Sequence, residues 1–237
     1  MAWTGAPPIA GGNRLGQGVD QPDGATAMSP RALLLAAGAG RRFGADKLSA
    51  NLADGTPIGV AAARNLLAAG CAVLAVMREP GQGIGPVLAS LGVEVVGCPE
   101  ARLGMGYSLA CGVRASQDAA GWLVALADMP FVQPQTITAV ARAMATGAEI
   151  AAPTLAGRRG HPVGFSARWR DDLLALRGDT GARALLATHA DRIVPVPVDD
   201  PGILQDLDRP RDLALAGKPI GADQGHPVAA EQSKRDD

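Results

Sequence analysis

RALLLAAGAGRRFGADK, Arg31–Lys47, is the stretch of the sequence that decides the fold. It opens with an apolar run at 32–37, whose length and residue types are typical of a buried parallel strand. The run ends in a segment that holds Gly38, Gly40 and Gly44. Because glycine lets backbone N–H groups turn inward and approach a ligand closely, the segment predicts a phosphate-binding loop after the first strand.

Three cations accompany these glycines. Arg41 and Arg42 lie inside the loop and Lys47 closes it, a combination that favours a nucleoside triphosphate. Two common phosphate loops do not fit: a dinucleotide fingerprint needs its third glycine one residue before Gly44, and a P-loop needs Ser or Thr where Leu48 follows the lysine. A glycine-rich turn with ordinary surface cations is the alternative interpretation.

Composition is that of a globular α/β protein. The 237 residues, 47% of them hydrophobic, are enough for one large domain with a substantial core. The formal net charge of −1 provides no basic field, so we expect no nucleic-acid partner. No apolar stretch is long enough to span a membrane. The three cysteines match no zinc or redox spacing, which indicates a cytoplasmic protein.

Both ends of the chain differ from its middle. Residues 1–29 are rich in glycine, proline and alanine and lack the features of a signal peptide, which predicts a disordered extension. Met28 offers an alternative start of translation. Residues 218–237 are polar and are expected to form a disordered tail. We therefore expect one folded domain over 30–217.

Apolar runs alternate with helical patterns between these ends. The predicted strands are 32–37, 72–77, 93–97, 121–127, 149–152 and 193–198. The predicted helices are 57–69, 85–91, 107–116, 134–146, 170–176 and 181–188. This alternation predicts an α/β fold, a three-layer sandwich in which helices cover both faces of a mostly parallel central sheet. Ligands of such sheets bind beyond the carboxyl ends of the strands.

Two acidic segments are candidates for a metal site. The strand in GWLVALADMP, Gly121–Pro130, ends at Asp128, and we expect this carboxylate beside the end of the first strand, where it would hold Mg²⁺ against phosphate oxygens. A turn or helix-capping aspartate is the alternative. In DLDRP, only one of Asp206 and Asp208 is expected to face the metal, and Asp208 could instead cap a helix at 211–216.

Six motifs in order resemble the MobA-like NTP transferase domain family, and most closely the molybdenum cofactor cytidylyltransferases. The matching segments are Leu35–Lys47, Gly104–Gly112, Ala127–Pro130, Gly160–Phe165, Gly178–Arg183 and Asp206–Pro210. The resemblance implies a Rossmann-like nucleotidyltransferase fold and an enzyme that transfers CMP from CTP to the phosphate of molybdopterin, with release of pyrophosphate. Thr180 and Arg209 depart from the family pattern, and these departures concern the acceptor more than the nucleotide.

The same resemblance implies roles for the phosphate loop and the acids. The residues that would wrap the triphosphate are Leu35, Ala36, Ala37, Gly38, Gly40, Arg41 and Lys47. Arg41 and Lys47 would balance the charge of the leaving pyrophosphate. Asp128, with Asp206 or Asp208, would hold Mg²⁺. Alanine rather than glycine at position 37 is similar to the cytidine-using branch.

Five further residues are expected near the nucleoside and the acceptor. By the same resemblance, Gly104, Gly106 and Ser108 would lie against the nucleoside, with Ser108 capping the helix at 107–116. His161 would face the acceptor, or would be a strand histidine satisfied by backbone groups. Arg183 would bind the acceptor's phosphate, or would cap or pair locally with Asp179.

The expected partners are CTP and a molybdopterin-type acceptor, together with a molybdoenzyme or its maturation chaperone; neither nucleic acid nor a membrane is expected. The same chemistry on another phosphorylated acceptor, such as a sugar phosphate or phospholactate, is one alternative. A non-catalytic nucleotide-binding assembly factor is the other. Retention of Arg41, Lys47 and Asp128 favours an enzyme.

Overall fold

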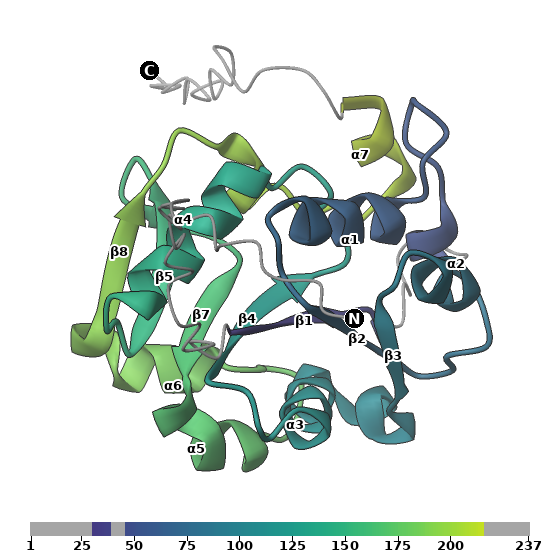
Figure 1. The fold of residues 1–237 in the computed structure, drawn as a ribbon. Coiled ribbons are helices and arrows are strands. Elements are labelled where there is room, and N and C mark those ends of the chain that lie inside the picture. The colour runs from purple at the N-terminus through teal and green to yellow at the C-terminus, as the bar shows by residue number, and fades with distance from the viewer. Residues whose placement is uncertain (1–29, 39–45, 216–237) are drawn as a thin grey trace, which may run out of the picture.

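The computed structural model describes residues 30–38 and 46–215 (Figure 1). The predicted N-terminal extension and C-terminal tail lie outside these residues, as do Gly40, Arg41, Arg42 and Gly44 of the predicted phosphate loop. Within the described part of the chain, no helix is long and apolar enough to cross a membrane.

The centre of the structure is one sheet of eight strands. They are β1 (Arg31–Leu35), β2 (Val73–Met77), β3 (Glu94–Gly97), β4 (Gly121–Leu126), β5 (Ile150–Leu155), β6 (Arg158–Arg159), β7 (Val163–Ser166) and β8 (Ile193–Pro197). Their order is β3-β2-β1-β4-β7-β5-β6, and β8 pairs with β5. The half built from β3, β2, β1 and β4 is parallel, whereas β7 runs antiparallel to both of its neighbours.

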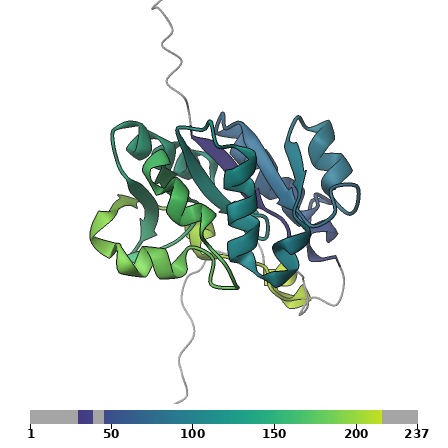
Figure 2. The ribbon, with the colours of Figure 1, turned by 90° about the horizontal axis from the view of Figure 1, so that it is seen from below.

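Helices cover both faces of this sheet. They are α1 (Ile58–Ala68), α2 (Gly85–Ser90), α3 (Met105–Ala115), α4 (Pro134–Ala145), α5 (Arg170–Leu174), α6 (Arg183–Thr188) and α7 (Pro210–Leu215). Short 3₁₀ turns are η1 (Lys47–Ser49), η2 (Pro99–Leu103), η3 (Ala167–Trp169), η4 (Ala190–Arg192) and η5 (Pro201–Leu204). Figure 1 shows α1 and α4 above the sheet, and α3, α5 and α6 below it; Figure 2 views the lower layer.

The first strand shows why the sequence folds in this way. Along β1, Ala32 and Leu34 pack in the core on the face of the sheet that α1 and α4 cover. Leu33 and Leu35 pack in the core on the opposite face, which α3 covers. Alternate side chains of a strand point to opposite faces, so a strand that is covered on both sides needs apolar residues throughout. The predicted three-layer α/β sandwich with a mostly parallel sheet is therefore confirmed.

The antiparallel part of the sheet departs from the predicted elements. β6 and β7 were not among the predicted strands, and β5 extends to Leu155 rather than ending at 152. The strand β6 has only two residues, which is too few for an alternating pattern to show. The strand β7 is held by antiparallel pairing with β4 and β5, a long-range choice that no local pattern indicates. Helix boundaries mostly agree with the expected ranges within two residues.

Ser108 does not cap its helix, so that prediction was wrong. The helix α3 begins at Met105 and the cap position is Gly104, which leaves Ser108 buried inside the helix. The start is set by Gly104, whose φ of 131° is a conformation that other residues rarely adopt. A Cβ atom there would lie 2.3 Å from the carbonyl carbon of Gly178, so the segment around Gly178 requires glycine at this position.

Candidate active site

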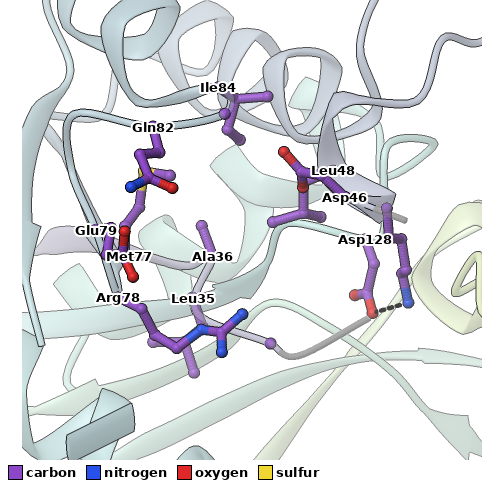
Figure 3. Close-up of a pocket in the computed structure, with 13 residues that line it drawn as sticks. Leu35, Ala36, Asp46, Leu48, Met77, Arg78, Glu79, Gln82, Ile84 and Asp128 are labelled. Atoms are coloured by element: carbon purple, nitrogen blue, oxygen red, sulfur yellow. Dashed lines mark hydrogen bonds and ion pairs between the residues drawn. The ribbon is translucent and has the colours of Figure 1, made fainter. Parts of the chain in front are cut away.

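A cavity of about 400 Å³ opens at the carboxyl ends of β1, β2 and β4 (Figure 3). Its walls come from the end of β1, the η1 turn, the loop after β2 and the turn after β4. The lining residues are Leu35, Ala36, Gly38, Asp46, Lys47, Leu48, Met77, Arg78, Glu79, Gln82, Gly83, Ile84 and Asp128. This is the edge at which parallel α/β sheets bind ligands.

Asp128 is held at this edge by the backbone on either side of it. The strand β4 pairs with β1 up to Leu126, and the N–H of Ala127 then donates to the carbonyl of Leu35 at 3.1 Å. Beyond the turn, the side-chain amide of Asn65 on α1 donates to the carbonyl of Pro130 at 2.8 Å. Asp128 therefore lies beside the end of the first strand, as the sequence predicts.

Lys47 joins two acids that lie far apart in the sequence. Its Nζ donates to Oδ2 of Asp128 at 2.8 Å and to Oδ1 of Asp208 at 2.9 Å. The lysine is only 9% exposed, whereas about a quarter of the Asp128 side chain reaches solvent. Figure 3 shows the ion pair with Asp128 on the wall of the cavity.

Burial and the two carboxylates act in opposite directions on this lysine. Burial by itself lowers the pKa of Lys47, because the charged form loses hydration. The hydrogen bonds and charges of Asp128 and Asp208 together outweigh that loss, so the pKa of Lys47 is raised above its ordinary value. At neutral pH the ammonium of Lys47 is therefore charged.

The two acids of the DLDRP segment occupy different environments. Leu207 between them is buried, and its N–H donates to the carbonyl of Asp128 at 3.0 Å. In a regular strand, residues two apart share one face. Here the chain turns into α7 instead, where Oδ2 of Asp212 accepts from the N–H groups of Asp208 and Arg209. Asp208 thereby meets Lys47, whereas Asp206 is exposed to solvent.

The donor set at Lys47 is suited to a hard divalent cation. Two carboxylates converge on one point, and a magnesium ion in a nucleotide site is commonly held by one or two carboxylates together with substrate phosphates and water. Residues 30–38 and 46–215 contain no cluster of three or more histidine, cysteine, aspartate or glutamate side chains that could form a complete metal cage. The arrangement therefore fits a metal that arrives with a phosphate ligand.

The predicted loop residues that the structure describes do not all line the cavity. Leu35, Ala36 and Gly38 line it. Ala37 is buried in the core on the α3 side and is not among the lining residues. Arg41 and Gly40 lie outside the described residues, and their predicted phosphate contacts stay predictions.

Gly106 and Ser108 are not among the residues that line the cavity. The N–H of Gly106 donates to the carbonyl of Gly178 at 2.8 Å, and a Cβ atom there would lie 2.8 Å from the carbonyl of Arg177. The glycine is thus needed for close packing between α3 and the loop before α6. The predicted contact of Gly106 and Ser108 with a nucleoside stays a prediction.

His161 lies behind the turn that carries Asp128. It lines a second cavity of about 10 Å³ together with Asn65 and Met129, and its backbone N–H donates to the carbonyl of Ile203 at 3.1 Å. The side chain is not fully satisfied, because its buried Nδ1 has no hydrogen-bond partner. Burial is the largest cause that lowers the pKa of His161, so the ring is neutral at pH 7.

Arg183 is exposed at the first residue of α6. It forms no ion pair with Asp179 within the described part of the chain, so the local pairing that was the alternative for this residue is absent. Its predicted contact with the acceptor's phosphate is not tested by the structure and stays a prediction.

The loop after β2 was missed in the sequence analysis. Met77, Arg78, Glu79, Gln82 and Ile84 form the wall of the cavity opposite Asp128 (Figure 3). The signal that could have identified them was present, because β2 was predicted to be parallel and ligands bind beyond the ends of such strands. The loop lacks a recognisable motif and therefore attracted no prediction.

This cavity has the end of a glycine-ended strand on one wall and Asp128 on another, and it opens at the edge of a mostly parallel α/β sheet. The chain belongs to the family with a MobA-like NTP transferase domain, because the model of that family matches residues 32–193. A search of curated proteins found no match.

Several solved structures have a similar fold. Rv0371c from Mycobacterium tuberculosis H37Rv is 24% identical, with a TM-score of 0.64, over 79% of this chain and 97% of that one. A Methanothermobacter nucleotidyl transferase, Mth528, is 22% identical, with a TM-score of 0.67, over 79% and 95%. The molybdopterin-guanine dinucleotide biosynthesis protein A of Archaeoglobus fulgidus is 19% identical, with a TM-score of 0.57, over 78% and 95%. At sequence identities of 19–24%, these similarities show a shared fold and nothing more.

Proposed function

We propose that this protein transfers CMP from CTP to the phosphate of molybdopterin or its molybdenum-loaded form, with release of pyrophosphate. The observation that carries the proposal is the convergence of Lys47, Asp128 and Asp208 on the wall of a cavity that opens beside the end of β1. Phosphoryl chemistry requires charge neutralisation and positioning, and this site supplies both positive and negative groups at one point.

In the proposed reaction, a terminal phosphate oxygen of the acceptor forms a bond to the α-phosphorus of CTP. The bond from that phosphorus to the bridging oxygen breaks, and the electron pair leaves with pyrophosphate. Lys47 contributes a charge and three rotatable donors to the phosphates. The backbone at Ala36 and Gly38 lies along the same cavity and would hold the triphosphate against the end of β1.

Asp128 and Asp208 are the residues that would hold a divalent cation, Mg²⁺ in our proposal. A bound divalent cation supplies Lewis-acid polarisation of a phosphoryl oxygen and neutralises charge on the phosphates. The chemistry of the two carboxylates fits Mg²⁺ or Mn²⁺. A structure of Rv0371c from M. tuberculosis was determined as a complex with manganese, which supports a divalent cation in this fold.

The cytidine preference rests on the LAAG form of the loop and on the family resemblance. Because Ala37 is buried away from the cavity, any effect of this residue on the base must act through the position of the β1 end. The groups that line the cavity near a bound base are better sought in the loop after β2, where Glu79 and Gln82 offer an acceptor and an amide. The cofactor that carries the transferred CMP would then pass to a molybdoenzyme or its maturation chaperone.

One assay tests the proposal. The purified protein is incubated with Mg²⁺, molybdenum-loaded cofactor, and CTP or GTP in turn, and pyrophosphate release is measured. We expect release with CTP that depends on the acceptor. Release only with a sugar phosphate or phospholactate would replace the proposed acceptor, and a GTP preference would replace the nucleotide. CTP binding without release for any acceptor would indicate an assembly factor.

A further inference from the structure

The ammonium of Lys47 occupies the place where a divalent cation would be held. It donates to Asp128 at 2.8 Å and to Asp208 at 2.9 Å, so the ammonium lies between one oxygen of each carboxylate. A metal held through these same two oxygens would have to displace Nζ from them. It would also lie within a few ångströms of a like charge, where repulsion is strong. The two cations therefore compete for one position.

We propose that Lys47 is the resident counter-ion of the metal site and that the triphosphate draws it away. In this mechanism Nζ leaves the two carboxylate oxygens only when phosphates are present, so the metal enters with the nucleotide rather than before it. The inference rests on the proposed function of the site, and it adds the order in which the ligands bind.

The position of Lys47 in the fold allows such an exchange. Its backbone is fixed in η1, where the N–H of Ala50 donates to the Lys47 carbonyl at 3.2 Å, and the neighbouring Leu48 is buried in the core. The ammonium itself lies at the end of a flexible four-carbon stem. Because Lys47 and Gly38 line the same cavity, phosphates bound at the end of β1 would offer the ammonium competing oxygens within that cavity. The charge can thus move while the backbone stays in place.

The chain offers a matched control for this exchange. Arg78 also lines the cavity, and Figure 3 shows it on the wall that faces Asp128. No ion pair joins Arg78 to Asp128 within the described residues. Removing Arg78 therefore subtracts the same charge from the cavity without vacating the position between the carboxylates. The control therefore distinguishes the effect of any lost positive charge in the cavity from the effect of removing the ammonium that lies between the two carboxylates.

The test measures Mn²⁺ binding without any nucleotide, by the electron paramagnetic resonance signal of free Mn²⁺. We expect Lys47→Met to bind Mn²⁺ on the order of tenfold more tightly than the wild-type protein, because a like charge in hydrogen-bond contact with both ligands is removed. Arg78→Met should change the affinity by roughly twofold or less. The double variant Lys47→Met, Asp128→Asn should lose the gain, which would locate the tight site at Asp128.

Equal or weaker Mn²⁺ binding by Lys47→Met would overturn the inference, as would an equal gain in Arg78→Met. If Lys47→Met does not fold, Lys47→Gln provides the same comparison, because it removes the charge and keeps a hydrogen-bond donor. Thermal melting adds a second readout: Mn²⁺ should raise the melting temperature of the variant more than that of the wild type. None of these measurements uses turnover, so their failure is distinct from the failure of the proposed reaction.

Discussion

Replacing Asp128 by asparagine should separate the stability of the site from its chemistry. The asparagine would keep the shape of the native side chain, and its carbonyl oxygen could still accept from Lys47. A charge-assisted hydrogen bond is worth about 1.5–3 kcal/mol. Here the loss is smaller, because Lys47 retains Asp208 and a quarter of the Asp128 side chain is exposed. We expect the free energy of unfolding to fall by about 1 kcal/mol or less.

The effect of Asp128→Asn on activity should be far larger. The variant removes one of the two carboxylates that converge on the metal position, and neutralisation by a metal contributes several kcal/mol to such reactions. A loss of about 3–5 kcal/mol corresponds to roughly two to four orders of magnitude in kcat/KM. Circular dichroism melting would report the fold, and pyrophosphate release with CTP and molybdenum-loaded cofactor would report the reaction.

The two acids of the DLDRP segment provide the matched comparison. Asp208 is ion-paired with Lys47, whereas Asp206 is exposed. Asp208→Asn should therefore lower kcat/KM by at least about tenfold, and Asp206→Asn by about twofold or less. A folded Asp128→Asn protein with wild-type turnover would refute the proposed role of the carboxylates. Equal effects of Asp206→Asn and Asp208→Asn would show that the ion pair does not distinguish the two acids.

Four further outcomes are expected. Lys47→Ala should raise the dissociation constant for CTP and lower kcat together, measured by titration and pyrophosphate release; normal kinetics would remove Lys47 from the phosphate site. Burial lowers the pKa of His161 below 6.5 in the folded protein, so the unfolded chain binds the proton more readily. The contribution of neutral His161 to the free energy of unfolding is therefore fully present above about pH 6.5 and is lost as the pH falls through the folded pKa. Urea midpoints should show that dependence in the wild type and less of it in His161→Gln. Asp200→Ala should cost about 3 kcal/mol in urea unfolding, because this buried carboxylate accepts from the N–H groups of Gln133 and Gly202 and from the Thr136 hydroxyl; a cost below about 1 kcal/mol would contradict that reasoning. Gly104→Ala should cost about 2 kcal/mol or more, since φ is positive and the new Cβ atom would meet Gly178, and an unchanged midpoint would show that the segment can shift.

Much of the fold could be predicted because its signals are local. A strand buried on both faces must be apolar at every position, and β1 satisfies this in consecutive residues, all of them buried from Ala32 to Leu35. The helices and parallel strands follow from similar periodic runs. The antiparallel strands β6 and β7 could not be predicted, because two to four residues carry too little pattern and their pairing with β5 and β4 is a long-range choice.

In the candidate site too, local sequence patterns predicted some features, and only long-range contacts decided the others. The sequence by itself predicted that an acid follows β4 beside the end of the first strand, and the structure confirms that position. It also predicts a phosphate loop after the first strand, most of which lies outside the described residues. Only the tertiary structure decided which acid of the DLDRP segment meets Lys47, because the turn into α7 is fixed by Asp212 and by the burial of Leu207. Only the tertiary structure showed that Lys47 holds two carboxylates that lie 81 and 161 residues further along the chain. Contacts across such separations depend on how packed elements bring loop ends together, and no local pattern encodes that distance.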